Sequence, residues 1–247
     1  FGIPKGYKVI ISMPNNQSIE KYKTLEALGA ELRLVPPCPF ADQNHFYHQA
    51  RIISENTPKS FWANQFENTA NSLAHYQTTG PEIWADTNSK IDAFTCAAGT
   101  GGTIAGVSCY LKEKSEKIHI RLVDPTGSGL AHHFQTGEIK STGSGSVTEG
   151  IGIMRLTANY LKAKIDEAVT IDDNKMISML YHLAQSDGLF LGTSSALNCV
   201  SAYELGLKWK NSGKTIVTVL CDHGSRYQSR ILDENWLKEK NLRIEKI

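Results

Sequence analysis

The stretch that decides the fold reads IDAFTCAAGTGGTIAGV and covers residues 91–107. Its first eight residues form an apolar run typical of a buried strand, which stops at a glycine cluster and passes at once into a helical pattern. We therefore expect a strand, a tight glycine loop and a helix, in that order. Because glycine has no Cβ, backbone amides in such a loop can approach an anion closely. The first turn of the following helix adds free N–H groups and a positive dipole end.

The glycine loop is interpreted as a cradle for a phosphate group. Its candidate ligands are Gly99, Thr100, Gly101, Gly102 and Thr103, and the two threonines add hydroxyl donors to the backbone amides. The plainer alternative is an ordinary strand-to-helix turn. Four closely spaced small residues and two threonines exceed what a turn needs, which favours the anion site.

Two familiar nucleotide motifs match this loop badly. A P-loop ends in Gly-Lys-Ser/Thr, whereas the first lysine after the glycines is Lys112. The dinucleotide fingerprint starts well, but Ile104 stands where its third glycine belongs. Asp124, at the end of the next expected strand, imitates the acidic ribose ligand of that fingerprint. A dinucleotide-binding dehydrogenase therefore stays open as a rival, with Ile104 against it.

Bulk properties exclude several classes of protein. The 247 residues allow one large or two modest domains, and 26 Lys and Arg against 25 Asp and Glu leave a net charge of +1. This balance predicts neither a nucleic-acid partner nor a membrane surface, and no apolar run approaches the roughly 20 residues of a membrane helix. A start at Phe1 without a leader suggests a fragment or a processed product.

Strand and helix patterns alternate along the chain, which is typical of a parallel sheet with helices on its faces. Expected strands cover residues 8–13, 31–35, 91–98, 118–123, 169–171 and 215–221. Expected helices cover 18–28, capped by Ser18, then 43–55, one continuous helix through Leu73 and Tyr76 toward Trp84, and others beginning near 104, 172 and 193. Residues 125–152 lack periodicity and suggest a functional loop.

Three turns of small polar residues, at 99–103, 192–195 and 222–224, follow strands or extended segments. In a parallel sheet the carboxyl ends of the strands lie at one edge, so we expect these turns to gather there. A Ser194, His223, Asp222 hydrolase is disfavoured because G-x-S-x-G is absent and adjacent Asp and His do not readily pair. The pair at 132–133 is interpreted as surface or loop histidines and the pair at 172–173 as helix caps. No metal site is expected.

Several stretches resemble one family in composition and in order. They are MP at 13–14, SIE at 18–20, LEALGAEL at 25–32, QFEN at 65–68, TGPEIW at 79–84, GTGGT at 99–103, EGIG at 149–152 and GTSS at 192–195. Together they resemble the fold-type-II pyridoxal-phosphate enzymes, in particular the cysteine synthase (O-acetylserine sulfhydrylase) family. DP at 124–125 and GTSSALN at 192–198 look most like its fungal cysteine-synthase-like branch, some members of which are associated with mitochondria. The location that the resemblance implies is therefore cytoplasmic or mitochondrial. The resemblance implies a tryptophan synthase β-like α/β fold with parallel-sheet, three-layer domains. Residues 1–60 would be the remainder of a smaller mobile domain, and 61–247 a larger cofactor-binding domain.

The resemblance also implies a cofactor and roles for single residues. Pyridoxal 5'-phosphate would place its phosphate in the 99–103 loop and its pyridine nitrogen at Ser194. Gln65 would meet the substrate carboxylate, and Gly150 would lie in the loop that lines the ring. Plainer readings are a helix N-cap for Ser194, a buried amide for Gln65 and a simple turn for Gly150. The implied reaction makes L-cysteine from O-acetyl-L-serine or another activated serine, with sulfide, in a homodimer.

Three departures from the family pattern bear on function. Ala196 stands where members usually have glycine, and CDHGSR at 221–226, with His223, replaces the common PDSGER. The family's Schiff-base lysine and its Ser-Gly-Asn-Thr loop both precede the start of this chain, and neither Lys5 nor Lys8 matches them. We therefore expect no catalytic residue in this chain and no turnover by it alone.

Rival functions from the same fold remain open at this point. They are cystathionine β-synthase, serine/threonine dehydratase and a synthase that uses phosphoserine. A non-catalytic binding or regulatory protein is a further alternative, which the presence or absence of an upstream lysine segment would decide.

Overall fold

The computed structural model describes residues 2–247, and Phe1 lies outside the described part. The chain forms two compact units. One comprises the chain up to Ala63 together with Ser225–Leu237, and the other comprises Asn64–Gly224 and Lys238–Ile247. The family resemblance implies a division into residues 1–60 and 61–247, whereas in the structure Ser225–Leu237 groups with the first unit.

A two-stranded parallel sheet is the centre of the first unit. Its elements are η1 (Ile3–Lys5), β1 (Ile10–Pro14), α1 (Ile19–Ala27), β2 (Glu31–Val35), α2 (Phe46–Glu55), most of η3 (Gly224–Tyr227), and α9 (Gln228–Ile231). Ser18 precedes α1 as expected, but its hydroxyl makes no capping bond and donates to the Arg226 carbonyl oxygen at 2.7 Å. The predicted cap is therefore wrong. This buried serine instead ties the 225–237 segment to the start of α1.

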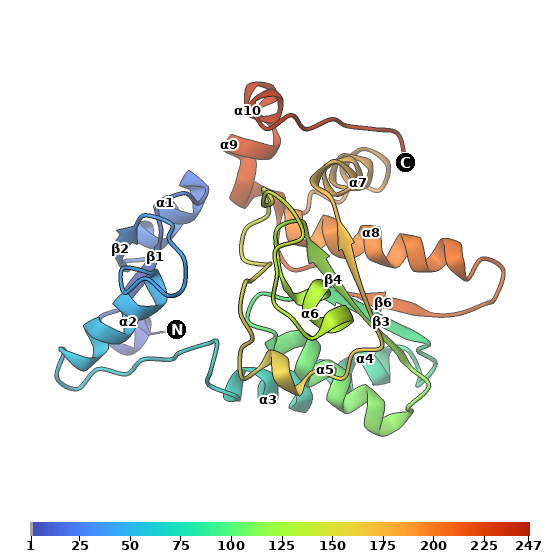
Figure 1. Cartoon of the computed structure of the whole chain (residues 1–247), viewed down its shortest axis with the longest axis horizontal. Coiled ribbons are helices and arrows are strands. Elements are labelled where there is room, and N and C mark those ends of the chain that lie inside the picture. The colour runs from blue at the N-terminus through green and yellow to red at the C-terminus, as the bar shows by residue number, and fades with distance from the viewer. Residues whose placement is uncertain (1) are drawn as a thin grey trace. The chain divides into compact units, whose positions relative to one another are not determined.

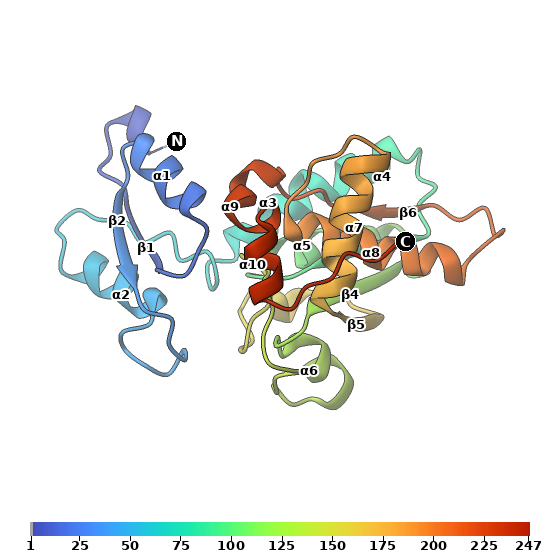
Figure 2. The same ribbon diagram turned by 90° about the horizontal axis from the view of Figure 1, so that it is seen from above.

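The second unit is a parallel sheet with helices on both faces. Its elements are α3 (Ala70–Gln77), α4 (Thr79–Asp86), β3 (Ala93–Ala97), α5 (Gly102–Lys114), β4 (His119–Pro125), α6 (Leu130–Thr136), η2 (Tyr160–Lys162), β5 (Glu167–Ile171), α7 (Asp173–Ser186), α8 (Thr193–Lys208) and β6 (Ile216–Thr218); α10 (Glu234–Glu239) crosses into it. The strand order is β5-β4-β3-β6, and every pair is parallel. Helices α7 and α8 cover one face, and α3, α4 and α5 lie on the other (Figures 1 and 2). The predicted parallel α/β class is confirmed.

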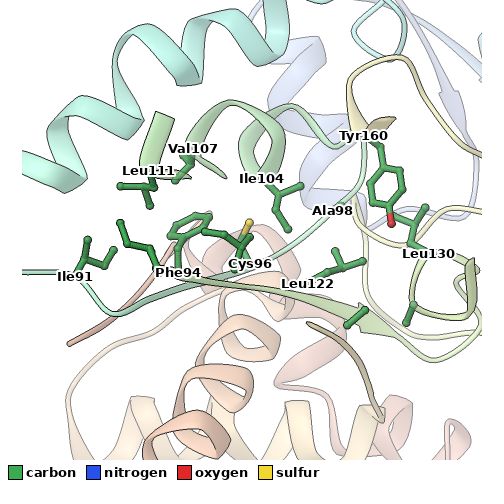
Figure 3. Packing of buried hydrophobic residues seen from close by; sticks show 14 residues of the cluster. Ile91, Phe94, Cys96, Ala98, Ile104, Val107, Leu111, Leu122, Leu130 and Tyr160 are labelled. Atoms are coloured by element: carbon green, nitrogen blue, oxygen red, sulfur yellow. The ribbon is translucent and has the colours of Figure 1, made fainter. Parts of the chain in front are cut away.

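Strand β3 is buried on both faces, which fixes where its carboxyl end lies. Phe94 and Cys96 point toward Ile104, Val107 and Leu111, the last three from α5 (Figure 3). On the opposite face, the Thr95 hydroxyl hydrogen-bonds a serine hydroxyl of α8 at 2.6 Å. Full burial of a side chain such as Phe94 stabilises the fold by about 2–3 kcal/mol. The glycine loop that follows β3 therefore starts from a rigid point.

The single helix expected through Leu73 toward Trp84 is two helices. Helix α3 ends at Gln77, and Thr78 has non-helical angles, φ −123° and ψ −71°, before α4 begins. Pro81 in the first turn of α4 has no N–H to donate to the preceding turn, so the chain restarts a helix there instead of continuing one. The continuous-helix prediction is wrong for this reason.

Residues 125–152 are more ordered than the pattern suggests. They contain α6, whose first residues Leu130 and Ala131 are buried, and this short helix was missed because seven residues give little periodicity. Asp172 caps α7 by accepting from the Lys175 N–H at 3.0 Å, as expected. Asp173 does not share that role, because it accepts from the Val147 N–H at 2.8 Å and holds the long loop against α7.

Asp124 gives the fold a pH-dependent stability. Its side chain is fully buried at the end of β4, and one oxygen accepts from the Ala131 N–H at 2.9 Å. Burial raises the pKa of this carboxyl to about 6, although hydrogen bonds from the start of α6 lower it. Between about pH 4 and pH 6 the folded state keeps a proton that the unfolded chain releases. The free energy of unfolding therefore falls as pH rises through that range.

We predict that Asp124→Asn removes this dependence, since the amide oxygen still accepts from Ala131 and carries no charge. Two pKa units correspond to about 3 kcal/mol as an upper bound. Urea unfolding at several pH values should therefore show that the free energy of unfolding of the variant rises relative to that of the wild type as pH rises from about 4 to about 6. A variant that loses stability relative to the wild type over this range contradicts the assignment.

Candidate functional site

The loop between β3 and α5 presents an uncapped helix N-terminus. Gly101 is the N-cap residue with φ 82° and ψ −2°, a left-handed conformation that favours glycine, and no side chain caps α5. The first N–H groups of a 13-residue helix and its positive dipole end are thus directed toward the loop. The arrangement suits an anion.

At three loop glycines a neighbouring segment occupies the space that a Cβ would need. A Cβ on Gly99 would lie 2.3 Å from the carbonyl oxygen of Gly150, and one on Gly101 would lie 2.6 Å from Cα of Tyr160. A Cβ on Gly102 would lie 2.0 Å from Oδ1 of Asn71. At Gly99 and Gly101 the obstacle is backbone, which leaves no room for a Cβ, whereas at Gly102 it is the end of the Asn71 side chain, which a Cβ would displace.

The two loop threonines are held by neutral partners. Thr100 Oγ1 accepts from the Asn71 side-chain amide at 2.9 Å and from the Gly102 N–H at 3.3 Å. Thr103 Oγ1 lies 3.1 Å from Nε2 of His75. Burial lowers the pKa of His75, so its ring is neutral at about pH 7. The hydroxyls are therefore positioned by groups that carry no charge.

The start of α8 meets the same edge of the sheet. Asn198 Oδ1 accepts from the Ala97 N–H at the end of β3, and its amide group donates to the Val219 carbonyl beyond β6, both at 2.8 Å. Ser195 Oγ accepts from the Cys221 N–H at 2.8 Å. The structure thus brings the turns at 99–103, 192–195 and 222–224 to one edge, the gathering expected from the pattern.

Ser194 and Ser195 differ in what their hydroxyls do. Ser195 is committed to the backbone of the 221–222 turn. Burial raises the pKa of the Cys221 thiol, and a hydrogen bond with the Ser194 side chain offsets part of this rise. Ser194 lies in the first turn of α8 with Gly192 as the N-cap residue, so the simple N-cap interpretation of Ser194 is wrong.

Gln65 and Gly150 flank the loop from two other segments. The Gln65 side chain is exposed, which contradicts the buried-amide alternative, while its carbonyl oxygen accepts from Asn71 at 2.8 Å and from Asn159 at 3.1 Å. Gly150 has φ 82°, and its carbonyl oxygen lies against Gly99. The backbone of each is thereby held beside the glycine loop.

Other chemistries find less support in the geometry. Asp124 faces inward and caps α6, so it is not placed as the ribose ligand of a dinucleotide site. His132 lies in α6 and not in a loop, and its Nδ1 is 2.8 Å from the Glu138 carbonyl oxygen. Within residues 2–247, no group of three or more His, Cys, Asp or Glu is arranged to hold a metal. In the same residues no helix is long and apolar enough to span a bilayer.

Comparison with known proteins decides the family. The model for pyridoxal-phosphate dependent enzymes matches residues 3–222. The chain belongs to this family. Cysteine synthase 1 of Neurospora crassa is 48% identical over 243 residues, 96% of this chain and 64% of the relative. Cysteine synthase A of Escherichia coli is 34% identical over 241 residues, 96% of this chain and 74% of the relative. The crystal structure of an O-acetylserine dependent cystathionine β-synthase from Helicobacter pylori has a TM-score of 0.81 at 30% identity, over 93% of this chain and 71% of that one.

Family membership confirms the fold-type-II resemblance and pyridoxal phosphate as the cofactor. The chain spans 64% of the length of the Neurospora relative. The residues present fit the cofactor's phosphate, because the uncapped start of α5 and the close-packed glycines form an anion cradle beside two hydroxyls.

Sequence reasoning missed the residues that support this site. They are the amides Asn71, Asn159 and Asn198 and the ring of His75, which connect segments far apart in the chain. Two of them carried a signal: Asn71 follows the QFEN stretch by three residues, and Asn198 ends the GTSSALN stretch at 192–198.

We predict that Gly101→Ala destabilises the fold by about 3 kcal/mol, because the left-handed φ and the clash with the Tyr160 backbone add. Gly206→Ala is the matched control: no atom lies within 4 Å of a Cβ there. Since Gly206 is in the interior of α8, its alanine should stabilise by about 0.5–1 kcal/mol. Chemical denaturation measures both, and equal effects of the two substitutions would contradict the account of the loop.

Proposed function

We propose that the full-length protein makes L-cysteine from O-acetyl-L-serine, or another activated serine, and sulfide. The observation that carries the proposal is the 48% identity to a cysteine synthase over nearly the whole chain. The cradle at the start of α5 and the hydroxyl of Ser194 at the same sheet edge support it. In the reaction, the bond from the β-carbon to the acetoxy oxygen breaks and a carbon–sulfur bond forms.

The residues of this chain bind and orient the reactants. Pyridoxal phosphate, when bound, supplies an electron sink for the negative charge that develops at the α-carbon. The loop amides and the hydroxyls of Thr100 and Thr103 would hold its phosphate. Ser194 would meet the pyridine nitrogen, and because a hydroxyl does not keep that nitrogen protonated as a carboxylate would, this contact would favour β-elimination over transamination. Gln65 orients the substrate carboxylate, and Gly150 lines the ring.

A second candidate is a cystathionine β-synthase. The Helicobacter neighbour, which is described as O-acetylserine dependent, favours it through its TM-score of 0.81. This candidate shares the amino-acid donor with the first and differs in the sulfur acceptor. The stronger identity to cysteine synthases places it second.

We predict that purified full-length protein shows the visible absorption band of bound pyridoxal phosphate and forms cysteine from O-acetylserine and sulfide. The matched reaction with homocysteine in place of sulfide should be slower by a factor of ten or more, about 1.4 kcal/mol in transition-state free energy. Absence of the band contradicts the cofactor assignment. Faster turnover with homocysteine would replace the first candidate by the second.

The assembly and location of the intact protein are also proposals. The family resemblance supports a homodimer that acts in the cytoplasm or in mitochondria. Sedimentation of the full-length protein tests the first statement, and cell fractionation tests the second.

A further inference from the structure

Asn71 connects two parts of the site that lie far apart in the chain. Its side-chain nitrogen donates to the Gln65 carbonyl oxygen at 2.8 Å and to Thr100 Oγ1 at 2.9 Å. Gln65 belongs to the crossing before α3, and Thr100 belongs to the loop before α5. One amide group therefore connects Gln65, the expected ligand of the substrate carboxylate, to Thr100, an expected ligand of the cofactor phosphate.

The carbonyl oxygen of Gln65 determines which way this amide faces. A backbone carbonyl can only accept a hydrogen bond, so Asn71 must turn its NH₂ group toward it. The same NH₂ group then donates its other proton to Thr100. The oxygen of Asn71 is left above Gly102, where the missing Cβ makes room for it. The contacts therefore admit one orientation of the amide.

The orientation of Asn71 sets the direction of the Thr100 hydroxyl. Thr100 Oγ1 accepts from Asn71 and, at 3.3 Å, from the Gly102 N–H, which uses both of its lone pairs. Its single O–H proton remains to be donated. Within residues 2–247 the Thr100 hydroxyl donates to no acceptor, and it lies beside the start of α5, whose N-cap residue Gly101 has no side chain. The proton is thus available to an anion in the loop.

We propose that Asn71 is a positioning residue, which fixes Thr100 as a hydrogen-bond donor to the cofactor phosphate and couples the phosphate loop to Gln65. The proposal rests on the proposed function. The segment around Asn159 supports the same coupling from the other side. The Asn159 amide donates to the Gln65 carbonyl at 3.1 Å, and the Thr157 hydroxyl donates to the Thr100 carbonyl at 2.6 Å.

The test compares affinities of full-length protein for pyridoxal phosphate and for pyridoxal, which lacks the phosphate. The dissociation constant for pyridoxal divided by that for pyridoxal phosphate isolates the contribution of the phosphate to binding. Thr100→Val should reduce this ratio by a factor of ten or more, the value of about one hydrogen bond to a charged group. Asn71→Ala should reduce it by a similar factor, and the double variant no further. Thr100→Ser, which keeps the hydroxyl, should retain the ratio.

Each result has one meaning. If Asn71→Ala weakens both ligands equally, or if the two substitutions add in the double variant, Asn71 does not act through the Thr100 hydroxyl and the proposal is overturned. If Asn71→Ala does not fold, a wild-type ratio in Thr100→Val alone overturns it, and a tenfold loss there with rescue by serine supports it. A wild-type protein that binds neither ligand contradicts the proposed function instead.

Discussion

The backbone of the loop after β3 is in direct contact with three other segments, and the site depends on that contact. Gly150 lies against Gly99, Tyr160 against Gly101 and Asn71 against Gly102. The backbone contacts at Gly99 and Gly101 leave no room for a Cβ, and a Cβ at Gly102 would displace the Asn71 amide, so the steric requirement for glycine exists before any ligand is considered. The N-cap residue Gly101 has no side chain to cap α5, and of the first N–H groups of this helix that of Gly102 reaches the Thr100 hydroxyl at 3.3 Å. Packing and anion binding thus arise from one constraint.

The groups that the structure places around this loop are neutral. Amides from Asn71 and the backbone, the hydroxyls of Thr100 and Thr103, and the uncharged ring of His75 are the contacts seen. A phosphate dianion held in this way is stabilised by oriented dipoles, which are fixed by the fold and need no reorganisation. The directions of the hydroxyl protons then matter more than net charge, and these directions are set by residues behind the loop.

The sequence predicted the parts of the fold that have strong local patterns. The apolar run into β3, the glycine loop and α5 follow from one continuous stretch, and β2 was placed at its observed bounds. The break between α3 and α4 was missed because the apolar spacing continues across Thr78 while Pro81 restarts the helix. The cap expected of Ser18 failed because a distant carbonyl, that of Arg226, competes for its hydroxyl.

Local sequence patterns did not predict the contacts of Asn159 and Asn198, because the partners of these amides are distant in sequence. Asn159 bonds Gln65 across 94 residues, and Asn198 bonds Ala97 across 101. An asparagine gives no periodic signal, so such partners emerge only when the chain is folded. The roles of the loop residues and of Ser194 were taken from a family resemblance, and they stay predictions until a cofactor is seen in place.

The central claim is that the loop at 99–103 holds the phosphate of pyridoxal phosphate while Ser194 meets the far end of the same cofactor. A crystal structure of the full-length protein with pyridoxal phosphate tests it most directly. The account predicts phosphate oxygens at about 2.7–3.0 Å from the loop amides and the Thr100 hydroxyl, with the pyridine nitrogen at Ser194. A phosphate bound elsewhere, or a ring nitrogen distant from Ser194, would contradict it.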